Sequence, residues 1–183
     1  MRAGRLRHRA LVLELSASLS TLELGARWVD IRVKEAAEGS APVGLRARTL
    51  VEVRARHFAG FIAGRYLAHG SRLFHITSQR DPKGNRTELI LTCEELIGQP
   101  AQYTASQGDT PKPCRVHITH GVARIGEHTG RAEYWTQLEV ALIEVGRPQA
   151  GAVFELGAER YRVVGLVEDD DDRVTRKLWV KKL

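Results

Sequence analysis

The residue types best suited to metal chemistry gather in one short stretch, where Cys114, His117 and His120 follow one another at three-residue spacing. Thiolate and imidazole groups are zinc ligands, so this spacing raises the question of a metal site. In an extended strand, however, residues three apart point to opposite faces, and one strand would not present all three side chains to one ion. A fourth ligand at a suitable spacing is also missing. We therefore expect no metal site here.

A run of four aspartates, residues 169–172, could suggest calcium binding. The run lacks the alternating oxygen ligands, the glycine and the glutamate of a calcium loop, so a solvated hairpin tip is the simpler interpretation. The sequence also lacks a nucleophile elbow, a phosphate-binding loop and a dinucleotide fingerprint. Four other histidines have no Ser/Asp partners in a triad-like motif: His8, His57, His69 and His75. The sequence therefore predicts neither an enzyme nor a bound cofactor.

Positive charge is unevenly distributed along the chain. Residues 1–99 hold 16 Lys/Arg and 10 Asp/Glu, whereas residues 100–183 hold 12 of each, so the whole net charge of +6 lies in the first part. Four arginines fall within the first nine residues: Arg2, Arg5, Arg7 and Arg9. This asymmetry indicates contact with an anionic partner, either DNA or an acidic protein surface. A frayed, solvated terminus is the alternative interpretation of the basic arm.

The elements that would position these residues are mostly strands. Residues 64–93 read as strand, tight turn, strand, hairpin loop and strand, because apolar runs with a period of two flank the turn-forming residues 81–85. The same order recurs 87 positions later, in residues 151–180. The final apolar runs, residues 89–91 and 178–180, match after a slip of two residues. This repeat of one β-meander predicts two similar domains in tandem.

The rest of the chain is expected to be extended as well. Residues 133–144 could be helical, but their β-branched and aromatic content favours a strand. The overall prediction is an all-β fold of two tandem small β-barrels with long inter-strand loops. The expected division is a first barrel over residues 1–98, a linker over 99–112, which is almost free of apolar side chains, and a second barrel over 113–183. Further strands are expected at residues 11–15, 27–34, 49–57, 114–119, 121–126 and 134–143.

Composition indicates in which cellular compartment the protein is expected to fold. Two cysteines are too few for a disulfide framework and indicate a reducing compartment. No apolar run approaches the roughly 20 residues of a membrane span. The first residues also lack the apolar core and cleavage site of a secretory signal, so none is expected.

Several stretches of the sequence, taken in chain order, resemble those of the head–tail joining proteins of long-tailed bacteriophages. Residues 1–9 resemble the Gly-Arg-Leu-x-His-Arg start of that family, residues 28–30 resemble the Trp that follows, and residues 54–57 resemble its basic strand end. Residues 70–94 resemble its closing meander, so the resemblance covers about residues 1–97. The second part is more distantly similar, through residues 151–163, to the small tail-attachment proteins of phage heads. Familiar members are single barrels, whereas this chain is expected to carry two.

The resemblance implies a structural role in the virion neck. The protein is then expected in the host cytoplasm during assembly and in the neck of the finished particle. Such proteins form a homo-oligomeric ring, here expected to be six- or twelve-fold, below the portal or connector. The ring closes the DNA channel after packaging and provides the platform for tail attachment. The implied partners are portal or connector proteins, tail terminator or tail tube proteins, and packaged double-stranded DNA in non-specific contact, with no membrane.

The resemblance also suggests which residues make these contacts. The arm residues Arg2, Arg5, Arg7 and Arg9 are the candidates for contact with the portal or connector. The long loop over residues 34–46 is the candidate for the channel, with five DNA-facing candidates: Lys34, Gly39, Pro42, Arg46 and Arg48. A nucleic-acid-binding barrel of the OB type is the alternative function. Its weak point is the aromatic content of 6%, because stacking platforms need several exposed rings.

Overall fold

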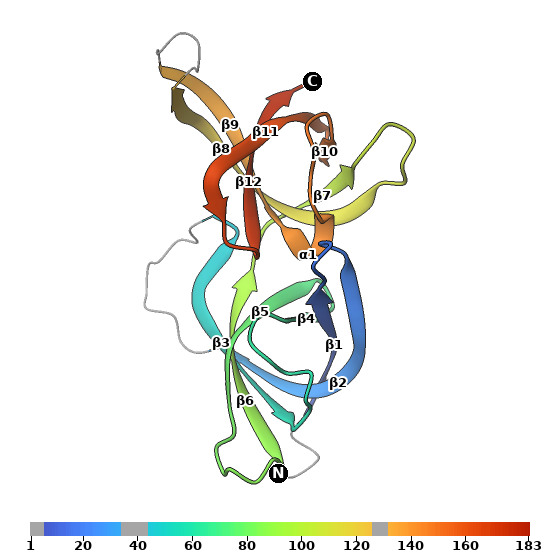
Figure 1. Cartoon of the computed structure of the whole chain (residues 1–183), viewed down its shortest axis with the longest axis vertical. Helices are drawn as coiled ribbons and strands as arrows, with labels where there is room; N and C mark the ends of the chain where they lie inside the picture. The colour runs from blue at the N-terminus through green and yellow to red at the C-terminus, as the bar shows by residue number, and fades with distance from the viewer. Residues whose placement is uncertain (1–5, 34–43, 126–131) are drawn as a thin grey trace. The chain divides into compact units, whose positions relative to one another are not determined.

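The computed structural model describes residues 6–33, 44–125 and 132–183. The chain divides into two compact units, one ending at Ile97 and the other beginning at Gly98. Each unit is one closed antiparallel barrel of six strands (Figure 1). The prediction of an all-β fold with two tandem small barrels is therefore confirmed. Among the described residues, no helix has the length and apolar content that crossing a membrane would require.

The first barrel has the strand order β1-β2-β3-β6-β5-β4, and β4 pairs back with β1 to close it. Inward-facing side chains of all six strands fill its core, including the fully buried Val53, Phe74 and Ile76. Closure leaves no open sheet edge, which removes the usual route to edge-to-edge aggregation. Its strands are β1 (His8–Leu15), β2 (Thr21–Val33), β3 (Arg46–Arg56), β4 (Tyr66–His69), β5 (Arg72–Arg80) and β6 (Glu88–Leu96).

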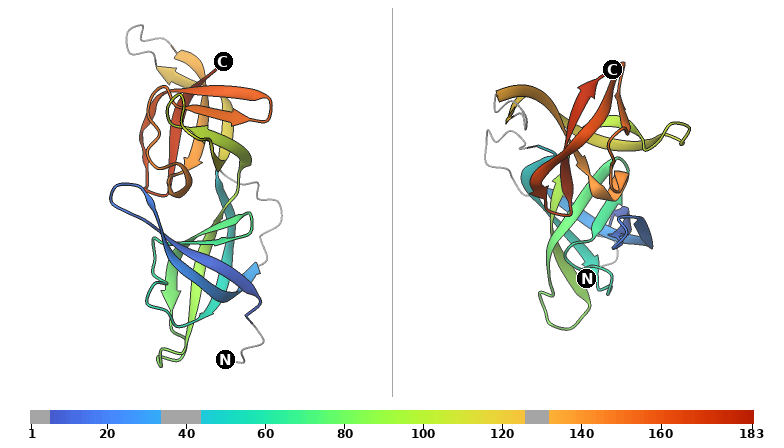
Figure 2. Two further views of the ribbon diagram at one scale, coloured as in Figure 1. Left: turned by 90° about the vertical axis from the view of Figure 1, so that its right-hand side faces the viewer. Right: turned by 45° about the horizontal axis from the view of Figure 1, so that its top comes forward.

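The second barrel repeats this order as β7-β8-β9-β12-β11-β10, with β10 pairing back to β7. Figure 2 shows the strands from two further sides, with β6 passing directly into β7. The helical turn α1 (Leu142–Val145) follows β9, and its Val145 packs into the core of the barrel. The strands are β7 (Gln99–Thr104), β8 (Lys112–Ile125), β9 (Ala132–Ala141), β10 (Val153–Leu156), β11 (Glu159–Asp171) and β12 (Thr175–Lys182).

The two barrels agree in register as well as in strand order. Ile76 pairs with Cys93 in the first barrel, and Val163 pairs with Val180 in the second, each 87 positions later. The register shifts immediately after both Ile76 and Val163, so both barrels carry a β-bulge at the same place. A bulge sharpens the local twist, which helps a six-strand sheet to close. The repeat predicted from the sequence is therefore present in three dimensions.

One detail of the predicted repeat was wrong. The slip of two residues between the final strands does not exist, because the register places Leu91 on Leu178 and Cys93 on Val180 at the constant shift of 87. The apolar runs 89–91 and 178–180 occupy different parts of their strands. Matching them by hydrophobicity alone therefore produced an apparent offset.

The predicted linker over residues 99–112 was also wrong, because it contains strand β7. Only Ala101 and Tyr103 of β7 are buried, and the other residues are polar or proline, so the strand has almost no apolar signature. Pro100 is tolerated because β10 pairs only with residues 102–104 of β7, which leaves the proline position without a β10 partner.

Three smaller expectations need adjustment. Residues 114–126 were expected to form two strands, but β8 runs continuously through a bulge and a positive φ of 69° at Gly121. β2 begins at Thr21, six residues before the strand expected over residues 27–34, because hydroxyl hydrogen bonds among Ser16, Ser18 and Ser20 close the preceding turn early. The strand preferred for residues 133–144 is present as β9, although its last residues form α1. Most of the predicted channel loop, residues 34–43, lies outside the described residues.

Candidate binding surface on the first barrel

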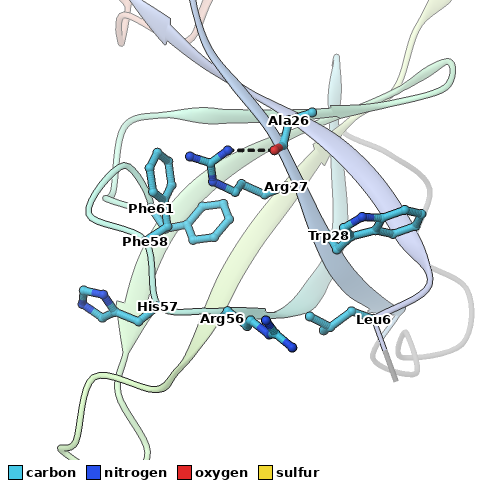
Figure 3. A pocket seen from close by; sticks show the side chains of 8 residues that line it. All are labelled: Leu6, Ala26, Arg27, Trp28, Arg56, His57, Phe58 and Phe61. Atoms are coloured by element: carbon cyan, nitrogen blue, oxygen red, sulfur yellow. Dashed lines mark hydrogen bonds between the residues drawn. The ribbon is translucent and has the colours of Figure 1, made fainter. Parts of the chain in front are cut away.

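An open pocket of about 650 Å³ lies at the end of the first barrel where β3 ends and β6 begins. This is the opposite end of β6 from Leu96, after which the chain continues into β7. Its walls come from the segment before β1, from β2 and from the β3–β4 connection. Figure 3 shows the lining residues: Leu6, Ala26, Arg27, Trp28, Arg56, His57, Phe58 and Phe61.

Side chains alternate between the two faces of a sheet, so two neighbouring residues of β2 point in opposite directions. Val29 faces the core, so Arg27 has the inward orientation and lies at the mouth of the barrel, whereas Trp28 faces outward (Figure 3). The guanidinium carbon of Arg27 lies 4.0 Å from the centre of the Phe58 ring, and its Nη1 donates to the Ala26 carbonyl at 2.8 Å. A cation on an aromatic face is an attractive contact that does not neutralise the charge.

The β3–β4 connection closes this end of the barrel with two phenylalanines. The rings of Phe58 and Phe61 meet edge to face, with centres 5.4 Å apart and planes at 87°, and Phe61 is buried in the core. The backbone turns tightly here, because the Phe61 amide donates to the Phe58 carbonyl at 3.0 Å. Arg65 anchors the turn by donating to the Gly60 carbonyl at 3.0 Å.

A Gly60→Ala variant tests this arrangement. A Cβ at residue 60 would lie 2.2 Å from the Phe58 ring, so the ring must move away from Arg27 and Phe61. We expect a loss of about 1–3 kcal/mol in unfolding free energy, as for other overpacked sites. Urea denaturation of the full chain measures this loss. A variant as stable as the parent would show that the Phe58 ring can move without cost.

Outward from the barrel, Trp28 lies between two arginines of neighbouring strands. Arg9 of β1 is its Cα partner, and Arg56 follows Ala55, the β3 partner of Val29. Trp28 is 58% exposed, and both arginines are exposed as well. Neither arginine makes an ion pair with a carboxylate in the part of the chain that the structure describes. We call Arg9, Trp28 and Arg56 the Trp28 patch.

The second barrel shows that its fold does not require such a patch. The pair Pro100–Arg115 occupies the register position of Arg9–Trp28, and Ala141 occupies that of Arg56. Arg115 is neutralised by Glu144 of α1, whose carboxylate accepts from the Arg115 Nε at 2.8 Å and from its backbone amide at 2.9 Å. Exposed aromatic and unpaired cationic side chains at this place are therefore a property of the first barrel alone.

The structure does not bring together the site residues expected from the sequence. Arg2, Arg5, Lys34, Gly39 and Pro42 lie outside the described residues. Arg7 is exposed just before β1, and Arg9 belongs to the Trp28 patch. Arg46 is half-buried in β3 and contacts the Glu94 carboxylate at 3.3 Å, so it is part of the barrel wall, and the backbone of Arg48 continues the same strand.

None of the eight residues that line the pocket was nominated from the sequence, although signals existed for three of them. Trp28 alternates with the core residues Val29 and Ile31, which places it on the solvent face of its strand. Arg56 and His57 end the strongly alternating strand 49–57 at a position where polar side chains reach solvent. An aromatic residue at a solvent-facing position was the signal that strand periodicity could have supplied.

The three residues of the Cys-His cluster, Cys114, His117 and His120, all belong to β8. Cys114 is buried in the second core, and burial raises the pKa of its thiol to about 12. His120 contacts the Thr136 hydroxyl at 3.2 Å. Across residues 6–33, 44–125 and 132–183, no three His, Cys, Asp or Glu side chains come together in a way that could hold a metal ion.

Comparison with protein-family models, with curated proteins and with solved structures finds no match to the chain.

Proposed function

We propose that the protein is a structural component of the neck of a tailed bacteriophage. In this role it forms a six- or twelve-fold ring below the portal or connector, closes the DNA channel after packaging and provides the platform for the tail. The observation that carries the proposal is the surface of the first barrel, which combines unneutralised arginines with an exposed Trp28. Two closed barrels in one chain suit a joint between two different assemblies.

Barrel closure supports assembly through side chains and loops. Because every strand of both barrels is paired on both sides, neither barrel offers a free sheet edge to a partner. Contacts between different surfaces of neighbouring copies can then close into a ring. In the proposed ring the arm residues Arg2, Arg5 and Arg7 are the candidates for contact with the portal or connector, whereas Arg9 belongs to the Trp28 patch.

The channel side of the proposal concerns the long connection between β2 and β3. Lys34, Gly39, Pro42, Arg46 and Arg48 are the proposed DNA-facing residues. Contact with phosphates there needs no base recognition, because lysine and arginine neutralise the backbone whatever the sequence. The excess charge of +6 on residues 1–99 is repeated in every copy of a ring and favours a channel that accommodates DNA.

The proposal is tested by removing the protein from the particle. Particles made without it are expected to show filled heads that leak DNA and carry no tails in electron micrographs. The mass of the full chain, measured alone and with the portal protein, shows whether rings form unaided or only on that template. Tailed, infectious particles without the protein would refute the proposed role.

A nucleic-acid-binding barrel remains the second candidate, because Trp28 and two unpaired arginines could meet a base and phosphates. Binding of the isolated chain to single-stranded DNA, weakening steeply with salt, would favour it. Absence of binding at low salt would eliminate it.

A further inference from the structure

The composition of the Trp28 patch is that of a protein-binding hot spot. Tryptophan and arginine are the residues most enriched among side chains that dominate binding energy, and they act in patches from which water is excluded. Leu11, which is 37% exposed, adds apolar surface beside Arg9 through its pairing with Ala26. The patch contains a single aromatic ring, which offers little for successive bases to stack on, so it favours a protein over a nucleic acid.

The charge of the patch defines what would bind it. Arg9 and Arg56 lack carboxylate partners among the described residues, so an occupant that brings carboxylates would neutralise both. An apolar side chain next to those carboxylates would cover Trp28. The partner is thus an acidic protein segment with an apolar residue beside its charges.

The chain itself contains a segment of this kind. Residues 168–172 read Glu-Asp-Asp-Asp-Asp and follow Val167 directly. β11 runs through Asp171 and β12 begins at Thr175, so the acidic run belongs to the β11–β12 hairpin of the second barrel. Glu168 and Asp172 are both exposed. Its counterpart hairpin in the first barrel, residues 81–85, has only one acidic residue and no such run.

We propose that the Trp28 patch of one copy binds the acidic β11–β12 hairpin of a second copy. Because the two surfaces differ, a bound pair of copies still presents one free patch and one free hairpin, and the contact is repeated from copy to copy. This deepens the neck proposal and rests on it in one respect: the contact would be the joint between neighbouring subunits of the ring. The contact itself can be tested on the purified chain alone.

The experiment uses two complementary variants of the full chain. Arg9→Glu with Arg56→Glu destroys the patch and keeps the hairpin, whereas Glu168→Lys with Asp170→Lys destroys the hairpin and keeps the patch. Asp172 is left unchanged because its carboxylate accepts from the Val174 and Thr175 amides at 2.9 Å and holds the turn. Sedimentation velocity is measured over about 1–100 µM, with circular dichroism to verify folding.

The expected results are specific to a contact between unlike surfaces. The parent chain self-associates, each variant alone is monomeric, and the equimolar mixture forms heterodimers that grow no further. Trp28→Ala weakens self-association by about 30-fold, as for a hot-spot residue. Tyr134→Ala is the matched control, because Tyr134 is an aromatic residue of the second barrel that is 76% exposed, and this change should leave association intact.

Three results would overturn the proposal: a parent chain that stays monomeric, a mixture that stays monomeric while the parent associates, or a Trp28→Ala variant that associates normally. Binding of oligo-dT that Trp28→Ala abolishes would assign the patch to nucleic acid and also overturn it. Rings that survive loss of the patch would leave the neck role standing with a different subunit joint. Tailed particles without the protein would refute the neck role whatever the contact does.

Discussion

A Phe154→Ala variant is expected to lose roughly 3–5 kcal/mol of the unfolding free energy of the second barrel. Phe154 is 0% exposed, and its ring centre lies 4.9 Å from that of Tyr103 across the β7–β10 pair that closes the barrel. Removing the ring leaves a cavity in the core of the second barrel. Small domains have only about 5–15 kcal/mol in total, so this loss brings the second barrel close to unfolding at ambient temperature.

The two units allow a matched control. Leu67 holds the same position in the first barrel and is also 0% exposed, so Leu67→Ala should destabilise the first barrel instead. Trp28 reports on the first barrel, whereas Trp135 and Trp179 report on the second. Urea titrations followed by fluorescence, with each tryptophan replaced in turn, separate the two transitions. If Phe154→Ala shifted both transitions equally, the barrels would unfold as one cooperative unit. The expectation that the two cores unfold independently would then be wrong.

Alkaline pH is expected to destabilise both barrels through their buried thiols. Burial raises the pKa of Cys93 and of Cys114 from the ordinary 9.0 to about 12. Below pH 9 both thiols are protonated in the folded and unfolded chains, and the full stability is present. Above pH 9 the unfolded chain releases these protons while the folded chain retains them, so stability falls as pH rises toward 12. Each barrel should lose about 2–3 kcal/mol between pH 8 and pH 11.

Urea denaturation at pH 8 and pH 11 measures this loss. Cys93→Ala should remove the part of the pH-dependent stability loss that the thiol causes, in the first barrel only. The loss that remains in this variant comes from other groups, such as lysines. In the second barrel Tyr161 adds to the slope, because its hydrogen bond to Glu159 and its burial raise the pKa of the phenol to about 12. An unchanged pH dependence in Cys93→Ala would show that the thiol is not shielded as the structure indicates.

The repeated meander could be predicted from the sequence because its markers are local. The paired glycines Gly70 and Gly157 have positive φ values of 58° and 59°, a conformation that few other residues adopt. Strand β7 could not be predicted, because a strand with two buried residues resembles a loop. It exists because β8 and β10 pair with it on either side.

The candidate site depends on information that one strand does not contain. The orientation of Trp28 follows from alternation within β2 and was accessible. Its proximity to Arg9 and Arg56 follows from the order β1-β2-β3 and from the pairing register, which link residues 19 and 28 positions away in the chain. Register is set by packing across the whole barrel, and a single sequence does not specify it.

The contiguous order of strands within each barrel has a consequence for synthesis on the ribosome. The first barrel has all its strands once β6 has emerged, so it can fold while the second is still being translated. The second barrel must wait for β12, which lies between β9 and β11 and completes its wall. A nascent chain stalled before Thr175 would therefore display one finished barrel and one that remains open to chaperones and proteases.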